Sequence, residues 1–425
     1  MDLVLFLCYF FPPLGGGGVQ RSAKFVKYLP ENGWHPIVVT VRPNLRNRIE
    51  QGVDYSLLGE AEDSRVLRCR SIEGSGLYAF LHRLRLRKIM FEVEGTIPLL
   101  HMDYKIGWYW PALRRSQEAI RRSPVRVIYS SSPPYSAHLV ARRLKQKYGL
   151  PWVADFRDPW TLVATYRPRT RLHGMVDAFL ERAIVREADV LVANTELNKA
   201  NLLARYGLPG EKVRVIPNGF DPADFPPGRR PEEKEFMISC FGKFYAMRNP
   251  EVFFHACRNF IQLHGNIFLR FWGWQPREVR RAARKILPQG TWEIRGRIEH
   301  DQAVREMQRS AVLLLNLPNE DCRHWIPGKL YEYLAADRPI LLIGPEGGNA
   351  AQILRETGTG QAVGENKEKI FAILESLYQC CGQGEPSWKP DREAIYRYNR
   401  RLQARELAAI FTDVLGMKAG TERMV

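Results

Sequence analysis

The stretch "IPGKLYEYLAADRPILLIGPEGG", residues 326–348, decides the fold. Pro327 suits the first turn of a helix, and apolar residues follow it at helical spacing. Residues 337–339 ("DRP") stop that helix, and residues 340–343 then form a short apolar strand. The pattern predicts a helix, a buried strand and a glycine loop from a covered parallel sheet.

Lys329 and Glu332 lie one turn apart on this helix, and therefore on one face. A local ion pair of modest strength explains the two charges but not their position behind a Pro-Gly pair in an aliphatic helix. A carboxylate at this position can also accept two hydrogen bonds from a cis-diol such as ribose. We favour this second interpretation.

The same alternation of strands and helices runs through the chain. Residues 3–7 and 37–41 are apolar strands on either side of a helix over 19–29, and "VRVIYSS", "WVADF" and "DVLVANT" continue the series. This order is typical of a doubly wound parallel sheet. The series restarts at "FMISCFGKF", so the sequence predicts two α/β sheets in tandem.

The pattern divides the chain into four segments. We expect a first domain over 1–216 and a linker, rich in proline and charge, over 217–235. A second domain covers 236–388, and a helical segment over 389–425 is expected to fold back toward the first domain.

The composition narrows the function classes. The chain has 425 residues, 45% hydrophobic content and a formal net charge of +17, which favours an anionic partner such as a nucleotide, an acidic membrane or a nucleic acid. The seven cysteines form no C-x-x-C pair, so they indicate neither a zinc site nor a disulfide framework and favour a cytoplasmic setting. The N-terminal "MDLVLFLCYFFPP" lacks a basic leader and is interpreted as a buried strand.

Two loops after predicted strands carry candidate ligand contacts. Residues 15–18 are four glycines that open a helix, where the backbone can approach an anion closely, although a bare tight turn also explains them. Lys243 and Arg248 follow the first strand of the second domain, at the sheet edge where ligands bind in open α/β folds. They can neutralise a diphosphate, or they are two solvated surface cations.

Four motifs together resemble glycosyltransferase family four, whose members are retaining enzymes of the GT-B fold. They are "LGGGGVQRSAKFVKYLPENGWHPIVVT", "VRVIPNGFD", "FGKFYAMRNPE" and "IPGKLYEYLAADRPIL", in this order along the chain. The resemblance implies an α/β protein with two Rossmann-like doubly wound domains that face a cleft. It also implies transfer of a sugar from a nucleotide-sugar to a saccharide or lipid-linked acceptor, in the synthesis of a surface polysaccharide or glycolipid.

The resemblance also implies roles for individual residues. Gly17 and Gly18 face the cleft, and Asn218 joins them in binding substrate. Lys243 and Arg248 act as the catalytic cations on the donor diphosphate. Glu332 binds the nucleotide ribose, with Lys329 on the same helix face.

One position departs from the family pattern. Many members carry a glutamate eight positions before the ribose glutamate, where it is thought to touch the donor sugar, and this chain has His324 there. His324 either hydrogen-bonds the sugar or lines the loop. The identity of the sugar is left open by this change.

The expected mechanism needs no metal and no cofactor beyond the nucleotide-sugar donor. The sequence has no Asp-x-Asp motif, and cations with a helix N-terminus can stabilise the departing diphosphate. The resemblance implies front-face attack, with the acceptor proton passing to a leaving phosphate oxygen. Asp155, Arg157 and Asp158 in "WVADFRDPW" are candidates to orient the acceptor hydroxyl, or they form a structural Asp–Arg network.

The partners stay open at several points. A basic run over 77–91, "LYAFLHRLRLRKIMF", rests on an anionic membrane surface or is a solvated helix, so we expect a cytoplasmic protein with possible peripheral attachment to the inner face of the membrane. A nucleotide-sugar epimerase or phosphorylase of the same fold is the alternative function. Nucleic-acid binding is disfavoured because the charge is spread out and no reading module is recognised.

Overall fold

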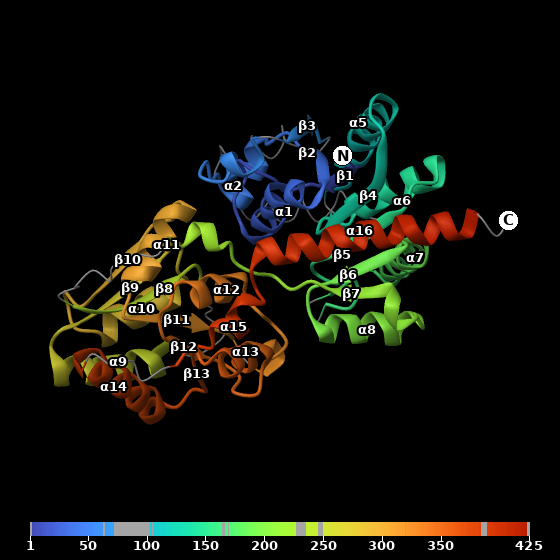
Figure 1. The fold of residues 1–425 in the computed structure, drawn as a ribbon. Helices are drawn as coiled ribbons and strands as arrows, with labels where there is room; N and C mark the ends of the chain where they lie inside the picture. Colours follow the sequence, from blue (N-terminus) through green and yellow to red (C-terminus); the bar gives the residue numbers. More distant parts are fainter. Residues whose placement is uncertain are drawn as a thin grey trace. The chain divides into compact units, whose positions relative to one another are not determined.

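The computed structural model describes residues 2–62, 64–71, 103, 105–163, 166–168, 170–226, 235–244, 250–318, 320–383 and 389–422. The chain forms two compact units, one of Met1–Asn218 with Arg400–Val425 and one of Gly219–Asn399 (Figure 1). Each unit contains one parallel sheet with helices between its strands. The predicted α/β class with two doubly wound sheets in tandem is confirmed.

The first unit is built on a seven-stranded sheet in the order β3-β2-β1-β4-β5-β6-β7. The strand order reverses between β1 and β4, and ligands of open α/β sheets bind beyond the carboxyl ends of the strands at such a point. The strands are β1 (Asp2–Cys8), β2 (Trp34–Val41), β3 (Arg65–Cys69), β4 (Val125–Ser132), β5 (Trp152–Phe156), β6 (Val190–Ala193) and β7 (Val213–Val215).

Both faces of this sheet are buried. Successive side chains of a strand point to opposite faces, so one strand contributes to two cores. Leu5 and Leu7 of β1 join one core, and Val4 and Phe6 join the other. Helices α1 and α16 cover the second core, where Figure 1 shows the long red α16 running across the sheet. The helices are α1 (Gly17–Tyr28), α2 (Leu45–Gln51), α5 (Tyr109–Arg122), α6 (Ser136–Tyr148), α7 (Arg171–Glu187), α8 (Glu196–Tyr206) and α16 (Arg400–Glu422).

The second unit is built on a six-stranded parallel sheet in the order β10-β9-β8-β11-β12-β13. Its strands are β8 (Phe236–Phe241), β9 (Ile267–Trp272), β10 (Trp292–Arg295), β11 (Val312–Asn316), β12 (Ile340–Ile343) and β13 (Gly360–Val363). The order again reverses at its centre, between β8 and β11. A second ligand-binding edge is therefore expected at the carboxyl end of β8.

Helices cover both faces of the second sheet as well. Residues of α9, α10 and α14 share one core, and residues of α11, α12, α13 and α15 share the other. Their bounds are α9 (Pro250–His264), α10 (Arg277–Ile286), α11 (His300–Arg309), α12 (Gly328–Ala335), α13 (Asn349–Thr357), α14 (Lys367–Gln383) and α15 (Arg392–Tyr396). Phe220 is 7% exposed in the second of these cores, so the first residues after Asn218 pack into this unit.

The opening stretch of the sequence folds as its pattern predicts. Pro327 is the N-cap of α12, and the apolar segment over 340–343 is strand β12. Between them, Asp337 adopts a positive φ of 57°, a conformation that ends a right-handed helix. In the described parts of the chain, no helix has the length and apolar character to cross a bilayer. The basic run over 77–91 lies outside the described residues.

Candidate functional site

The carboxyl end of β8 is the centre of the candidate site in the second unit. Gly242 follows the strand directly and has a φ of 79°, which an L side chain rarely adopts. Gln275 fixes this turn from the loop between β9 and α10: its Nε2 donates to the Gly242 carbonyl at 2.8 Å, and its Oε1 accepts from the Phe244 amide at 2.9 Å. A sharp, held turn thus leads the chain into Lys243.

Lys329 approaches the same strand end from α12. Its Nζ donates to the carbonyl oxygen of Phe241 at 2.7 Å and lies 3.9 Å from the position that a Cβ on Gly242 would take. Burial lowers the pKa of Lys329, an effect that the nearby Cys240 and Glu332 oppose. The structure therefore places an amine beside the turn where the sequence predicted a ligand edge.

Glu332 has a partner that the sequence did not suggest. Its Oε1 lies 2.8 Å from Nε2 of His300, and Nδ1 of His300 lies 3.8 Å from Asp224. The Glu332 side chain is 13% exposed, so this contact holds the carboxylate in one orientation while leaving it reachable. His300 begins α11, which follows β10, and is the kind of residue that orients a binding group.

The other predicted residues of this unit lie nearby in different settings. Lys243 is exposed, with its Nζ 5.6 Å from the ring centroid of Trp274. His324 is also exposed, on the segment just before α12, where its Nε2 accepts from Nε of Arg323 at 3.2 Å. Arg248 lies outside the described residues.

The glycine loop of the first unit leads from β1 into α1. A Cβ on Gly18 would lie 3.0 Å from Nη1 of Arg157, whereas one on Gly17 would meet nothing within 4 Å. The close approach of Arg157 accounts for Gly18, and Gly17 borders open space. Arg157 also forms a 2.8 Å ion pair with Asp158, whose side chain is 47% exposed. The structure thus brings Gly17, Gly18 and Asp158 to one end of the first sheet.

Asp155 lies near the carboxyl end of β5, in a buried polar network. Its two oxygens accept from Nε and Nη2 of Arg21 at 2.9 and 2.8 Å. The hydroxyls of Tyr129 and Ser131 donate to the same carboxylate at 2.7 and 2.8 Å. Arg21 also donates to the carbonyl oxygens of residues 216 and 217, so the network ties α1 to the segment that follows β7.

The network shifts the titration of its members. Burial alone would raise the pKa of Asp155, but the charge and hydrogen bonds of Arg21 outweigh it and lower that pKa. Burial also acts to lower the pKa of Arg21, yet the charge of Asp155 raises it above its ordinary value. The pKa of Tyr129 is raised by burial and by the adjacent Asp155. Asp155 and Arg21 are therefore both charged at neutral pH.

Asn218 ends the N-terminal part of the first unit. It is half-buried, and its backbone oxygen accepts from Nε2 of Gln403 on α16 at 3.3 Å. The sequence pattern missed Arg21, Gln275 and His300, because each acts on a residue far away in the chain. The only sequence signal for Arg21 is its place in the helix after the glycine loop.

Comparisons with known proteins bear on this geometry. Residues 15–224 match the model of Glycosyltransferase Family 4. A D-inositol 3-phosphate glycosyltransferase from Nocardiopsis dassonvillei is 28% identical over 182 residues, which are 41% of this chain and 37% of that protein. The matching part of the chain thus spans little more than a third of the length of this curated relative.

Solved structures match over nearly the whole chain. A glycosyltransferase from Rickettsia africae has a TM-score of 0.64, 15% identity and coverage of 97% of this chain and 98% of its own. HepE from Anabaena, solved with UDP-glucose, has a TM-score of 0.57 and 12% identity over 100% of both chains. These likenesses show a fold of the GT-B type. The match of residues 15–224 to Glycosyltransferase Family 4 confirms the family that the motifs indicated.

Proposed function

We propose that the protein is a retaining glycosyltransferase that moves a sugar from a nucleotide-sugar to a saccharide or lipid-linked acceptor, in the synthesis of a surface polysaccharide or glycolipid. The observation that carries this proposal is the end of β8, where Lys329 reaches the Phe241 carbonyl and Glu332 is oriented by His300. The family match and the fold shared with a protein solved with UDP-glucose support it.

The proposed donor site uses fixed charges. Lys243, together with Arg248, binds the diphosphate and stabilises the negative charge that develops when it leaves. Glu332 accepts hydrogen bonds from the ribose diol, and His300 positions its carboxylate. In the first unit, Asp158 orients the acceptor hydroxyl, while Asp155 is a positioning residue because its oxygens are bound within the protein. The acceptor oxygen attacks the anomeric carbon on the face that the diphosphate leaves, and a diphosphate oxygen takes the acceptor proton.

The ribose assignment is tested with Glu332→Ala. Hydrogen bonds to a charged group contribute about 1.5–3 kcal/mol, so losing this carboxylate should weaken nucleotide-sugar binding by about 10- to 100-fold. A donor is first found by screening nucleotide-sugars for thermal stabilisation, and its affinity is then measured by calorimetry. Glu368→Ala, which removes an exposed glutamate of α14 in the same unit, is the matched control.

Two results separate the proposal from its rivals. Release of nucleoside diphosphate that depends on an added saccharide or lipid-linked acceptor supports a transferase. Isomerisation of the sugar without any acceptor would instead establish an epimerase. Equal affinities of Glu332→Ala and Glu368→Ala for the donor would refute the ribose assignment.

A further inference from the structure

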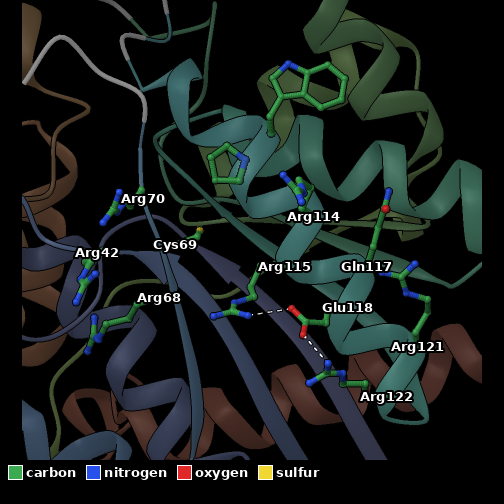
Figure 2. Close-up of a pocket in the computed structure, with 12 residues that line it drawn as sticks. Arg42, Arg68, Cys69, Arg70, Arg114, Arg115, Gln117, Glu118, Arg121 and Arg122 are labelled. Carbon is green, nitrogen blue, oxygen red and sulfur yellow. Dashed lines mark hydrogen bonds and ion pairs between the residues drawn. The ribbon is translucent and has the colours of Figure 1, made fainter.

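A groove lined with arginines lies in the first unit, at the edge of its sheet, and the proposed transfer reaction does not use it. It encloses about 960 Å³ between α5 and the ends of β2 and β3. Figure 2 shows Arg42, Arg68 and Arg70 gathered on the strand side, with Arg115 extending toward them from α5. This volume is in the range of small-molecule sites, far above the needs of one inorganic ion.

The helix side of the groove is equally basic. Arg114, Arg115, Arg121 and Arg122 line it from α5. Glu118 is the single acidic side chain among the described lining residues, and its two oxygens are bound by Arg115 at 2.9 Å and Arg122 at 3.0 Å. These arginines lower the pKa of Glu118, first through the Arg115 hydrogen bond and then through the charge of Arg122. The groove therefore carries a large excess of positive charge.

Several of these arginines have side-chain donors that are available to bind a ligand. Within the described residues, no hydrogen bond or ion pair engages the side chains of Arg42, Arg70 and Arg114. Arg68 donates through Nη2 to the carbonyl of Pro12 at 2.6 Å, but its buried Nη1 has no hydrogen-bond partner. A buried donor without a partner is unfavourable, and a bound anion would satisfy it.

The arrangement favours phosphate over carboxylate. A phosphoryl group has three acceptor oxygens and about 1.5 to 2 negative charges, so several guanidinium groups can converge on it. A carboxylate is satisfied by fewer, as Glu118 shows with one arginine on each oxygen. The excess of arginines on two sides of one cavity exceeds what a single phosphoryl group can neutralise.

We propose that this arginine groove, defined by Arg42, Arg68, Arg70, Arg114, Arg115, Arg121 and Arg122, binds a ligand that carries two or more phosphoryl groups. The indole of Trp110, 65% exposed at the start of α5, offers the same ligand a flat apolar surface. Such phosphoryl groups belong either to a free polyphosphorylated molecule or to lipid headgroups. The site does not depend on the donor-binding residues of the second unit.

Binding of inorganic tripolyphosphate, measured by calorimetry on the full chain, tests the proposal. Arg42→Gln/Arg114→Gln should weaken it at least tenfold, since neither side chain forms a hydrogen bond or ion pair with any other described residue. Arg182→Gln/Arg205→Gln removes the same charge from exposed positions of α7 and α8 and should change it less than twofold. Thermal melting checks that both variants are folded.

Further measurements identify the chemical class and the source of the ligand. Vesicles with phosphatidic acid that compete with tripolyphosphate identify lipid headgroups, and failure to compete identifies a free ligand. Tricarballylate that binds as tightly as tripolyphosphate would overturn the phosphoryl assignment. Equal losses in the two double variants, or no binding of either phosphate probe, would overturn the site. The groove variant should bind nucleotide-sugar normally, and a parallel loss would show that these arginines serve the donor instead.

Discussion

Replacing Asp155 by Asn tests whether the buried network holds the first unit together. The substitution keeps the size of the side chain but removes the charge that faces Arg21 across bonds of 2.8 and 2.9 Å. The side chains of Arg21 and Asp155 are 1% and 0% exposed, so water cannot replace the missing partner. The guanidinium would remain buried with carbonyl oxygens and a neutral amide as its only acceptors.

The size of the effect follows from this burial. Removing one partner of a buried ion pair destabilises a protein by about 3–5 kcal/mol, because the other charge is left uncompensated. Two carbonyl oxygens still accept from Arg21, which favours the lower part of that range. Tyr129→Phe, which removes a single 2.7 Å hydrogen bond to the carboxylate, should destabilise by about 1.5–3 kcal/mol. Asp413→Asn, at an exposed pair with 3.8 Å separation, should change stability by less than about 1 kcal/mol.

Urea unfolding followed by tryptophan fluorescence measures these differences. The lowered pKa of Asp155 means that its stabilisation is present above the unfolded-state value, near pH 4, and is lost as the pH falls through the folded value. The difference in the free energy of unfolding between wild type and Asp155→Asn should therefore be fully present at pH 7 and should decrease in acid. If Asp155→Asn and Asp413→Asn unfolded at the same urea concentration at pH 7, the network would be of no consequence for stability.

Three further predictions concern other residues. Burial lowers the pKa of His138 to about 3, whereas the unfolded chain binds a proton at this residue below about pH 6.5. The free energy of unfolding should therefore fall by about 2 kcal/mol between pH 7 and 5. His138→Gln should reduce this pH dependence in unfolding experiments, and an unchanged pH dependence would contradict the assignment. Lys329→Met loses the hydrogen bond to the Phe241 carbonyl and should weaken donor binding at least tenfold in calorimetry, whereas equal affinity would remove Lys329 from the site. Gly18→Ala adds a Cβ 3.0 Å from the flexible end of the Arg157 side chain. The free energy of unfolding should change by less than about 1 kcal/mol, while the rate of sugar transfer should fall. A loss of several kcal/mol would show that the Arg157 side chain cannot move aside.

The fold class could be predicted because it depends on patterns among residues that are close in the sequence. Strand β12 was predicted from four consecutive apolar residues at 340–343, since a strand covered on both faces needs apolar side chains throughout. Helix α12 was predicted from its spacing and from Pro327, and the stop at 337–339 coincides with the positive φ of Asp337. These signals need only a few neighbouring residues.

The partners of the site residues could not be predicted in the same way. Arg21 is 134 positions from Asp155, and His300 is 32 positions from Glu332, so no local period records either contact. The sequence did foresee an Asp–Arg network around Asp155 as one alternative, but with Arg157 as its arginine. In the structure Arg157 packs on Gly18 and pairs with Asp158, and Arg21 takes the buried place. Sheet topology decides which arginine reaches the carboxylate.

The position of Arg21 links stability to the proposed chemistry. It lies three residues after Gly18 in α1, so the bonds that hold its guanidinium also fix the helix N-terminus that borders the glycine loop. The carboxylate it binds sits at the carboxyl end of β5, three residues before Asp158. The same guanidinium holds the carbonyls just before Asn218. One buried pair thereby positions three of the predicted substrate contacts at once, because each lies within a few residues of an atom that the pair holds. Groups fixed in this way are what an electrostatically preorganised site requires.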